Sequence, residues 1–421
     1  MSEILRHIVS QNRNGHAVAI PSVCSAHPDV ISASLGLAAK QERAIVIEAT
    51  SNQVNQEGGY TGMRPRDFVE MVHELADTAG LPRNQIIFGG DHLGPQAWRH
   101  LTADEAMQNA HVMVAEYVAA GFTKIHLDCS EGCQGEAAAL PDEITAKRSA
   151  ELAATCLDAA ANANSLTFVI GTEVPPPGGA RADEQGDIPA TTEQSAAATL
   201  QAHEAAFEAA NIGHAFGQVV GLVVQPGVEF SPLSVHPYPK NRKLPFRKVL
   251  ESWPGICVEA HSTDYQEPDV FPKLAAEGFA FQKVGPVLTF AWRQAIYKLD
   301  MIRRLQGHTG ETVYDTMHQL MLDEPAKWQG HYPPEAAELS LALHFGLADR
   351  IRYYWPHPKA EAAVQDLMDS LAANPPADPL LWQFFSAEAV ANARQSNLPL
   401  TRALIAAEVQ AALAPYLFEA S

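Results

Sequence analysis

The feature that most constrains the fold of this chain is a regular alternation, repeated eight times, of short apolar runs with longer amphipathic segments. The runs are rich in β-branched residues, and most are followed by glycine, proline or polar residues, which is typical of buried strands. They are residues 17–20, 45–49, 85–89, 124–128, 167–171, 219–224, 256–259 and 279–284. Eight strand–helix units within about 300 residues predict a (β/α)8 TIM barrel. An open, doubly wound sheet is the alternative.

The segments between the runs predict helices, because their apolar residues recur at spacings of three and four. The clearest of them are residues 64–79, 102–120, 142–163, 192–211 and 286–305. After residue 305 the pattern predicts helices alone, at residues 311–322, 335–346, 360–373 and 400–417. We therefore expect a barrel over residues 1–305 that carries the functional site, and a helical extension over residues 306–421 packed on it.

The charge of the chain limits its partners. With a formal net charge of −20 and a pI near 5.2, it lacks the basic surface that binding to nucleic acid or to an anionic membrane requires.

The five cysteines, an odd number without framework spacing, predict free thiols in a reducing compartment. No apolar run approaches the ~18 residues of a membrane span, and no apolar signal core follows Met1. We expect a cytoplasmic protein.

Polar and charged side chains gather at the carboxyl ends of the predicted strands. Asp91 and His92 follow the third strand directly, in a loop that ends in glycine and proline. The other strand ends supply Glu48, Asn52, His126, Asp128, Glu173, Gln225, Glu259, His261 and Lys283. Because these ends converge on one face of a barrel, and buried charges are costly unless they are paired or bind a metal, the pattern predicts a divalent cation with a polyhydroxylated ligand.

Two basic segments are candidates for holding a phosphate. In the extension, residues 349–356 combine Arg350 and Arg352 with three aromatic side chains. These residues serve equally well to anchor the extension to the barrel or to contact a second subunit. Residues 236–243 form a basic loop after the sixth strand, on the same face as the predicted site.

Ten motifs of the chain resemble those of the GatZ/KbaZ family. They lie at residues 22–28, 47–53, 58–63, 89–95, 124–128, 170–175, 224–229, 259–266, 283–286 and 350–356. Among the longest are Gly-Gly-Asp-His-Leu-Gly-Pro at 89–95 and Glu-Ala-His-Ser-Thr-Asp-Tyr-Gln at 259–266. The resemblance implies an accessory subunit of tagatose-1,6-bisphosphate aldolase or, as in some relatives, a sugar or sugar-phosphate 4-epimerase.

The order of elements is more remotely similar to the class II, metal-dependent aldolases. That similarity implies proton transfer by Asp91 and metal binding by His92, His261 and Glu173, with zinc as the expected cation. The chain departs from the aldolase pattern at Gln225, where those enzymes have a third histidine ligand, so Glu173, Asp128 or Gln225 has to complete the metal site. It also departs at residues 262–265, where their phosphate-binding loop is missing.

The favoured function is therefore a metal-dependent epimerase that interconverts D-tagatose 6-phosphate and D-fructose 6-phosphate at C4 by retro-aldol chemistry. Asp91 or Glu173 is the expected base. The expected substrate-binding residues are Glu48, Asn52, Asp128, Gln225, Glu259, Lys283 and Arg350.

Two other functions stay open at this stage. The first is a non-catalytic, stabilising subunit of a class II D-tagatose-1,6-bisphosphate aldolase, and the second is a Schiff-base aldolase that uses Lys283. A kinase has no support, because the chain contains no Gly-x4-Gly-Lys-Ser/Thr loop. The expected partners are a ketohexose phosphate and either a second copy of this chain or the aldolase's catalytic subunit.

Overall fold

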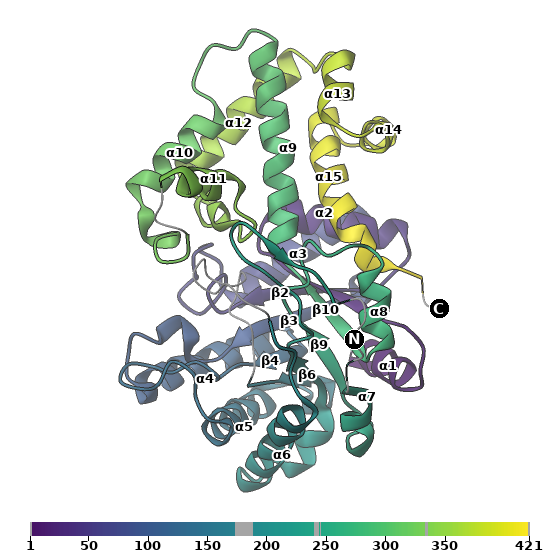
Figure 1. The fold of residues 1–421 in the computed structure, drawn as a ribbon, viewed down its shortest axis with the longest axis vertical. Coiled ribbons are helices and arrows are strands. Elements are labelled where there is room, and N and C mark those ends of the chain that lie inside the picture. The colour runs from purple at the N-terminus through teal and green to yellow at the C-terminus, as the bar shows by residue number, and fades with distance from the viewer. Residues whose placement is uncertain (1, 173–187, 240–243, 245, 333–335, 420–421) are drawn as a thin grey trace.

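Eight parallel strands form a closed barrel in the computed structural model, which describes residues 2–172, 188–239, 244, 246–332 and 336–419. Figure 1 shows the barrel below a group of helices that rise from one end of it. The strands are β1 (Ile20–Cys24), β2 (Ile45–Thr50), β3 (Ile86–Leu93), β4 (Lys124–Leu127), β5 (Thr167–Ile170), β6 (Val219–Val224), β9 (Cys257–Ala260) and β10 (Phe279–Val284). β1 pairs with both β2 and β10, which closes the sheet and confirms the predicted TIM barrel.

Helices alternate with the strands around the outside of the barrel. They are α2 (Pro28–Lys40), α3 (Pro65–Ala79), α4 (Ala103–Ala120), α5 (Asp142–Ala159), α6 (Glu193–Ala209), the single turn α7 (Phe246–Val249) and α8 (Val270–Ala276). Local sequence sets their ends: Thr102 and Glu105 form a capping box before α4, and Gly121 ends that helix in the left-handed conformation. Between β6 and α7 the chain also forms a small antiparallel hairpin of β7 (Glu229–Phe230) and β8 (Val235–His236).

The first strand differs from its prediction. The sequence predicts a strand over residues 17–20 that stops at Pro21, because proline is normally excluded from the interior of a sheet. In the structure β1 begins at Ile20, includes Pro21 and pairs Ser22 with Val46 of β2 and with Lys283 of β10. The predicted position was therefore wrong, and β1 extends to Cys24, at the carboxyl end of the barrel.

The amino end of the barrel is closed by α1 (Ser2–Arg13). Leu5 and Val9 of α1 are buried in one apolar cluster with side chains from the strands, among them Val46, Ile87 and Phe281. Because this end is filled with apolar groups, polar chemistry has to take place at the opposite end.

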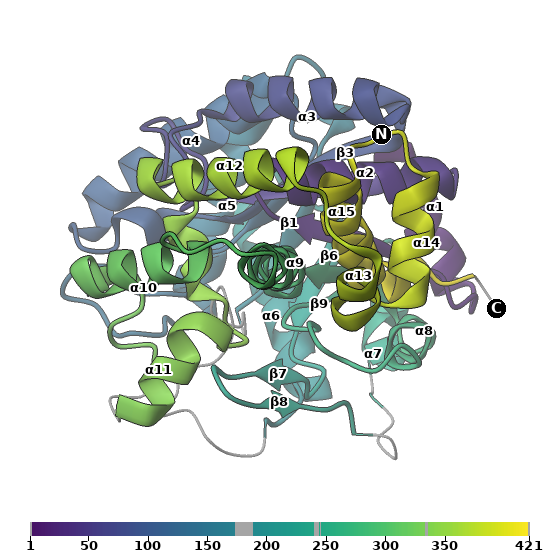
Figure 2. The same cartoon turned by 90° about the horizontal axis from the view of Figure 1, so that it is seen from above.

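The helix that follows the eighth strand, α9 (Pro286–Leu305), leaves the barrel and packs against helices of the carboxyl-terminal part. Those helices are α10 (Val313–Asp323), α11 (Ala336–Phe345), α12 (Pro358–Ala373), α13 (Asp378–Phe384), α14 (Ala387–Gln395) and α15 (Leu400–Leu413). Figure 2 shows α9 end-on, with α10 and α12 on one side and α15 on the other. α15 also packs against α2, which joins the carboxyl-terminal helices to the barrel. The division at residue 305 stays a proposal.

None of the helices that the structure describes has the length and apolarity needed to cross a lipid bilayer.

Candidate active site

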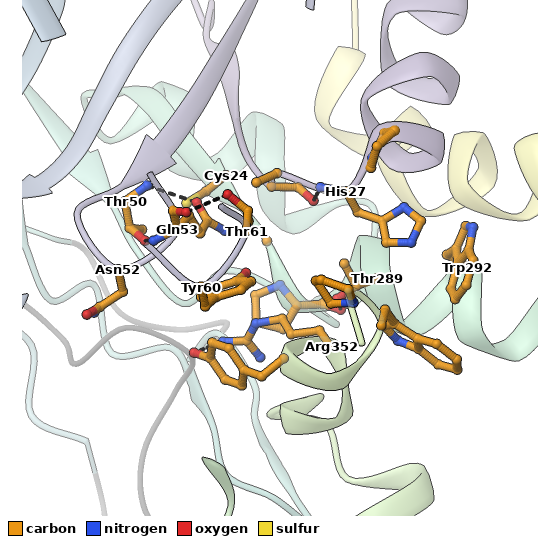
Figure 3. A pocket seen from close by; sticks show the side chains of 18 of the residues that line it. Cys24, His27, Thr50, Asn52, Gln53, Tyr60, Thr61, Thr289, Trp292 and Arg352 are labelled. Carbon is orange, nitrogen blue, oxygen red and sulfur yellow. Dashed lines mark hydrogen bonds between the residues drawn. The ribbon is translucent and has the colours of Figure 1, made fainter. Parts of the chain in front are cut away.

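A cavity of about 460 Å³ lies at the carboxyl end of the barrel, between the strand ends and the carboxyl-terminal helices. The barrel side is lined by Asp91, His92, His261 and Lys283, among others. The opposite wall includes Arg352, in the short 3-10 helix η7 (Arg350–Tyr354), and residues of α12 and α15. Figure 3 shows Cys24, Thr50, Gln53, Tyr60 and Arg352 around this pocket. Its volume is in the range of small-molecule sites.

Asp91, the sixth residue of β3, is the most connected carboxylate of the cavity. Its Oδ1 forms an ion pair with Nζ of Lys283 and lies 3.0 Å from Nδ1 of His126, and its Oδ2 accepts a hydrogen bond from Sγ of Cys24 at 3.1 Å. Burial alone would raise the pKa of Asp91, but the charges of His92 and Lys283 outweigh it and hold the pKa well below its usual range. The carboxylate is therefore ionised at neutral pH.

Three histidine side chains lie close to the carboxylate of Asp91. The ring centroids of His92, His126 and His261 lie 5.0 to 5.2 Å from one another, and all three side chains are buried. Asp91, His126 and His261 each place a potential ligand atom within 4.8 Å of the others. Nε2 of His126 is buried and has no hydrogen-bond partner among the described residues. One carboxylate and two imidazoles, one with an unused nitrogen, fit a divalent cation such as zinc.

His92 lies beside this group, and Asp128 holds its ring in place. Nδ1 of His92 is 2.7 Å from Oδ2 of Asp128, whose Oδ1 accepts a hydrogen bond from the hydroxyl of Ser130. The backbone φ of +47° at His92 belongs to the left-handed region, which is uncommon for residues other than glycine. Burial lowers the pKa of His92, but Asp91 and Asp128 outweigh it, so that the pKa is raised overall.

Below the cavity floor, two lysines and two glutamates form a buried network of ion pairs. Nζ of Lys124 lies 2.7 Å from Glu48 and 2.6 Å from Glu259, and Nζ of Lys283 lies 2.6 Å from Glu48. Glu259 also contacts Nε2 of His261 at 2.9 Å. Burial lowers the pKa of Lys283, but Asp91, Glu48 and Glu259 raise it well above its ordinary value. A lysine held as a cation is a poor nucleophile, which disfavours the Schiff-base alternative.

The structure places the other predicted site residues in different surroundings. Asn52 lines the cavity, whereas Glu48, Glu259 and Asp128 lie behind its wall and orient the side chains in front of them. Oε1 of Gln225 accepts hydrogen bonds from the backbone N–H groups of residues 227 and 228, so this side chain stabilises its own loop.

Arg350 does not belong to the described cavity lining. Its Nε donates to the backbone carbonyl of Lys327, and the guanidinium that does line the cavity is that of Arg352, two residues later. Glu173 and the proline-rich residues 175–179 lie outside the described residues, as do residues 240–243 of the basic loop.

Lys124 was not among the predicted site residues, and His126 was named at a strand end without a specific role, although the sequence contained a signal for both. Lys124, His126 and Asp128 alternate along one strand, and alternate residues of a strand point to the same face. Lys124 at the start of β4 was part of that series, and its side chain is completely buried. A completely buried lysine requires acidic partners, which here are Glu48 and Glu259.

Comparisons with known proteins agree on one family. The family model described as D-tagatose-1,6-bisphosphate aldolase subunit GatZ/KbaZ-like matches residues 5–421. The chain is 46% identical over 389 residues to the D-tagatose 6-phosphate 4-epimerase of Agrobacterium fabrum, a match that covers 91% of each chain. A crystal structure of a probable tagatose 6 phosphate kinase from Sinorhizobium meliloti is 45% identical, with a TM-score of 0.84, and the match covers 94% of this chain and 99% of that one.

Proposed function

Because the chain belongs to the GatZ/KbaZ-like family of D-tagatose-1,6-bisphosphate aldolase subunits, we propose that its cavity interconverts D-tagatose 6-phosphate and D-fructose 6-phosphate by epimerisation at C4. The observation that carries this proposal is the pairing of an ionised carboxylate, Asp91, with the cationic Lys283, both facing the cavity next to three imidazoles. The name of the Agrobacterium relative, D-tagatose 6-phosphate 4-epimerase, supports the choice of substrate.

Inversion at C4 needs more than the removal of a proton from carbon. C4 of a 2-ketose is not adjacent to the C2 carbonyl, so the anion formed by deprotonating C4 has no resonance stabilisation. Breaking and remaking the C3–C4 bond avoids this difficulty. The O4 proton goes to a base, the C3–C4 electron pair moves toward the C2 carbonyl to give an enediolate, and C4 becomes an aldehyde. After rotation about C4–C5, C3 attacks the other face of that aldehyde, and the base returns the proton to O4.

Asp91 fits the role of that base, because it is ionised, faces the cavity and is fixed by Lys283, His126 and Cys24. Lys283 contributes a fixed positive charge where the negative charge of the enediolate develops. Glu173, the other expected base, lies outside the described residues and stays a prediction.

We further propose that His126, His261 and one oxygen of Asp91 hold a divalent cation, with zinc as the first candidate, while the other oxygen of Asp91 stays available to take the O4 proton. When bound, such a cation polarises the substrate's oxygens and stabilises the enediolate charge. The sequence predicts His92 and Glu173 as ligands together with His261. The observed positions favour His126 as a ligand, and leave His92 as a neighbour that Asp128 orients.

The decisive experiment incubates the purified chain alone with D-tagatose 6-phosphate in D2O, with and without a chelator. The expected result is D-fructose 6-phosphate that carries no deuterium at C4, since the C4–H bond survives a retro-aldol route. Deuterium at C4, measured by NMR, would contradict that route.

The family description also supports a second candidate, the accessory subunit of a class II aldolase. This alternative predicts no turnover by the chain alone, even with metal bound, and stimulation of a separate aldolase subunit. The kinase activity in the name of the Sinorhizobium structure gains no support from this chain, which lacks a Gly-x4-Gly-Lys-Ser/Thr loop. The cytoplasmic location and the oligomeric state stay predictions.

A further inference from the structure

Arg352 is a cation of the cavity wall that forms no direct ion pair with any carboxylate in the described part of the chain. Lysine and arginine side chains of the described cavity lining are Lys283, Arg352 and Arg402. Lys283 is paired with carboxylates, and the exposed Arg402 lies 3.4 Å from Asp29. No carboxylate of the described residues forms an ion pair with Arg352, which is only partly exposed. A half-buried charge of this kind is stabilised by an anion.

The guanidinium of Arg352 is oriented by hydrogen bonds that leave one edge open. Nη1 donates to the backbone carbonyls of Ala348 and Asp349, and Nη2 donates to the hydroxyl of Tyr353 at 2.9 Å. The same group lies over the ring of Tyr353, 4.4 Å from its centroid. Within the described residues, no acceptor is found for Nε, and the hydroxyl of Tyr353 is the single acceptor of Nη2. Two parallel N–H groups on one edge of a guanidinium match two oxygens of a phosphate.

The segment that carries Arg352 is fixed from two sides. Asp349, at a φ of +46°, accepts hydrogen bonds from Nε of Arg293 at 3.0 Å and from Oγ1 of Thr289 at 2.6 Å, both on α9. The backbone of Leu347 receives a hydrogen bond from Tyr265, at 2.6 Å, and donates one to a carbonyl of the loop after β6. The position of Arg352 relative to the barrel is therefore set before any ligand binds, which lowers the entropic cost of binding.

We propose that Arg352 binds the phosphate monoester of the substrate, through its free Nε and Nη2 edge, while the sugar's C3–C4 bond lies near Asp91. The identity of the sugar rests on the proposed function, whereas the anion site rests on Arg352 itself. The carboxyl-terminal helices thus supply a specificity residue, and the barrel supplies the reacting groups.

The test measures equilibrium binding of fructose 6-phosphate, unphosphorylated fructose and inorganic phosphate by calorimetry, to the full chain and to three variants. Arg352→Met removes the charge, and Arg352→Lys keeps the charge but loses the planar fork. Arg350→Met is the matched control, because Arg350 lies on the same turn and over the same ring of Tyr353 but not in the cavity lining. Thermal melting checks the fold of each variant.

The expected result is that Arg352→Met weakens binding of fructose 6-phosphate by about 30-fold or more, as befits the loss of a charge-assisted pair. Arg352→Lys should lie between that variant and the wild type, and Arg350→Met should change binding by less than about threefold. Inorganic phosphate should compete with fructose 6-phosphate in the wild type and lose that ability in Arg352→Met.

Wild-type-like binding of fructose 6-phosphate by a folded Arg352→Met variant would overturn the proposal, as would equal losses for fructose and for its phosphate. If Arg352→Met does not fold, the other two variants decide. The proposal is then overturned if Arg352→Lys binds fructose 6-phosphate as tightly as the wild type while Arg350→Met binds it more weakly. If the chain binds fructose 6-phosphate through Arg352 but forms no epimer, the phosphate site is supported and the proposed epimerase function is rejected.

Discussion

Asp91, the proposed base, shows how a barrel can prepare a single side chain for proton transfer. Its carboxylate is buried but keeps a pKa well below the usual range, because Lys283 and the neighbouring histidines outweigh the cost of burial. A base of low pKa is weak in solution. In the proposed reaction, Lys283, His126 and Cys24 hold the Asp91 carboxylate close to the reacting hydroxyl, and this fixed position compensates for its low basicity.

Replacing Asp91 with asparagine is expected to lower kcat by about 1,000-fold, because the amide keeps the shape of the carboxylate but cannot accept the O4 proton. Steady-state assays of epimerisation measure the effect, and circular dichroism checks that the fold is kept. Asp104→Asn, an exposed change at the start of α4, is the control. An Asp91→Asn variant that retains a tenth of the wild-type rate would show that another group is the base.

His126 offers a separate test of the metal proposal. Its unpartnered, buried Nε2 points to a ligand role, so His126→Gln is expected to weaken binding of zinc at least ~10-fold. Metal content after dialysis against a graded chelator gives the readout without any assay of activity. His111→Gln, on α4 outside the barrel, should keep the wild-type metal content. Equal zinc retention in both variants would exclude His126 from the site.

At the scale of elements, the sequence predicted the alternation of strands and helices well, because apolar periodicity reports directly on which face is buried. The first strand was wrongly predicted to stop at Pro21. Proline usually avoids the interior of a sheet, but the sequence does not show that the neighbouring strands accommodate it at this position. The ion pairs between strands could not be predicted from the sequence either. Lys124 is recognisable as a partner of Glu48 and Glu259 only once β4, β2 and β9 are placed around one axis.

The choice between Arg350 and Arg352 illustrates the same limit. Both belong to one basic, aromatic motif, and sequence alone gives no reason to prefer either. The 3-10 turn that follows Asp349 decides which guanidinium faces the cavity, and that turn depends on contacts of Asp349 with α9.

A histidine on α6 predicts how the stability of the whole barrel depends on pH. His203 is buried, and desolvation lowers its pKa from 6.5 to about 4. Between these two values the unfolded chain binds the proton more strongly, so the free energy of unfolding should fall as the pH falls from about 7 to 4. The shift corresponds to about 3 kcal/mol of stability at neutral pH.

Urea unfolding at pH 7 and at pH 4.5 measures this contribution. His203→Leu is expected to lose less stability between the two pH values than the wild type does. The same substitution at the exposed His100 is the control and should leave the pH dependence unchanged. Parallel losses in the wild type and in His203→Leu would mean that His203 does not titrate in this range.

At the scale of the whole molecule, the cavity is a joint product of the barrel and the carboxyl-terminal helices. The strand ends line one wall and residues of η7, α12 and α15 line the other, while α1 closes the far end of the barrel. A cavity with walls from both parts is suited to retaining two fragments of a cleaved sugar until they rejoin.

Retention of the fragments leads to a prediction about the reverse half of the reaction. Supplied with dihydroxyacetone and glyceraldehyde 3-phosphate, the full chain should form both ketohexose 6-phosphates, but far more slowly than it epimerises either one, because the fragments must enter from solution. Chromatography of the sugar phosphates over time measures both rates. Condensation as fast as epimerisation would identify an aldolase rather than an epimerase.

The buried ion pairs beneath the cavity also have a consequence for sequence divergence. Loss of the Lys124 ammonium would leave Glu259 without its closest cation and Glu48 with Lys283 alone, and the uncompensated buried charge would cost several kcal/mol. Descendants of this chain are therefore expected to keep these three positions together or to replace them jointly with neutral residues, so that natural variation here should be correlated rather than independent.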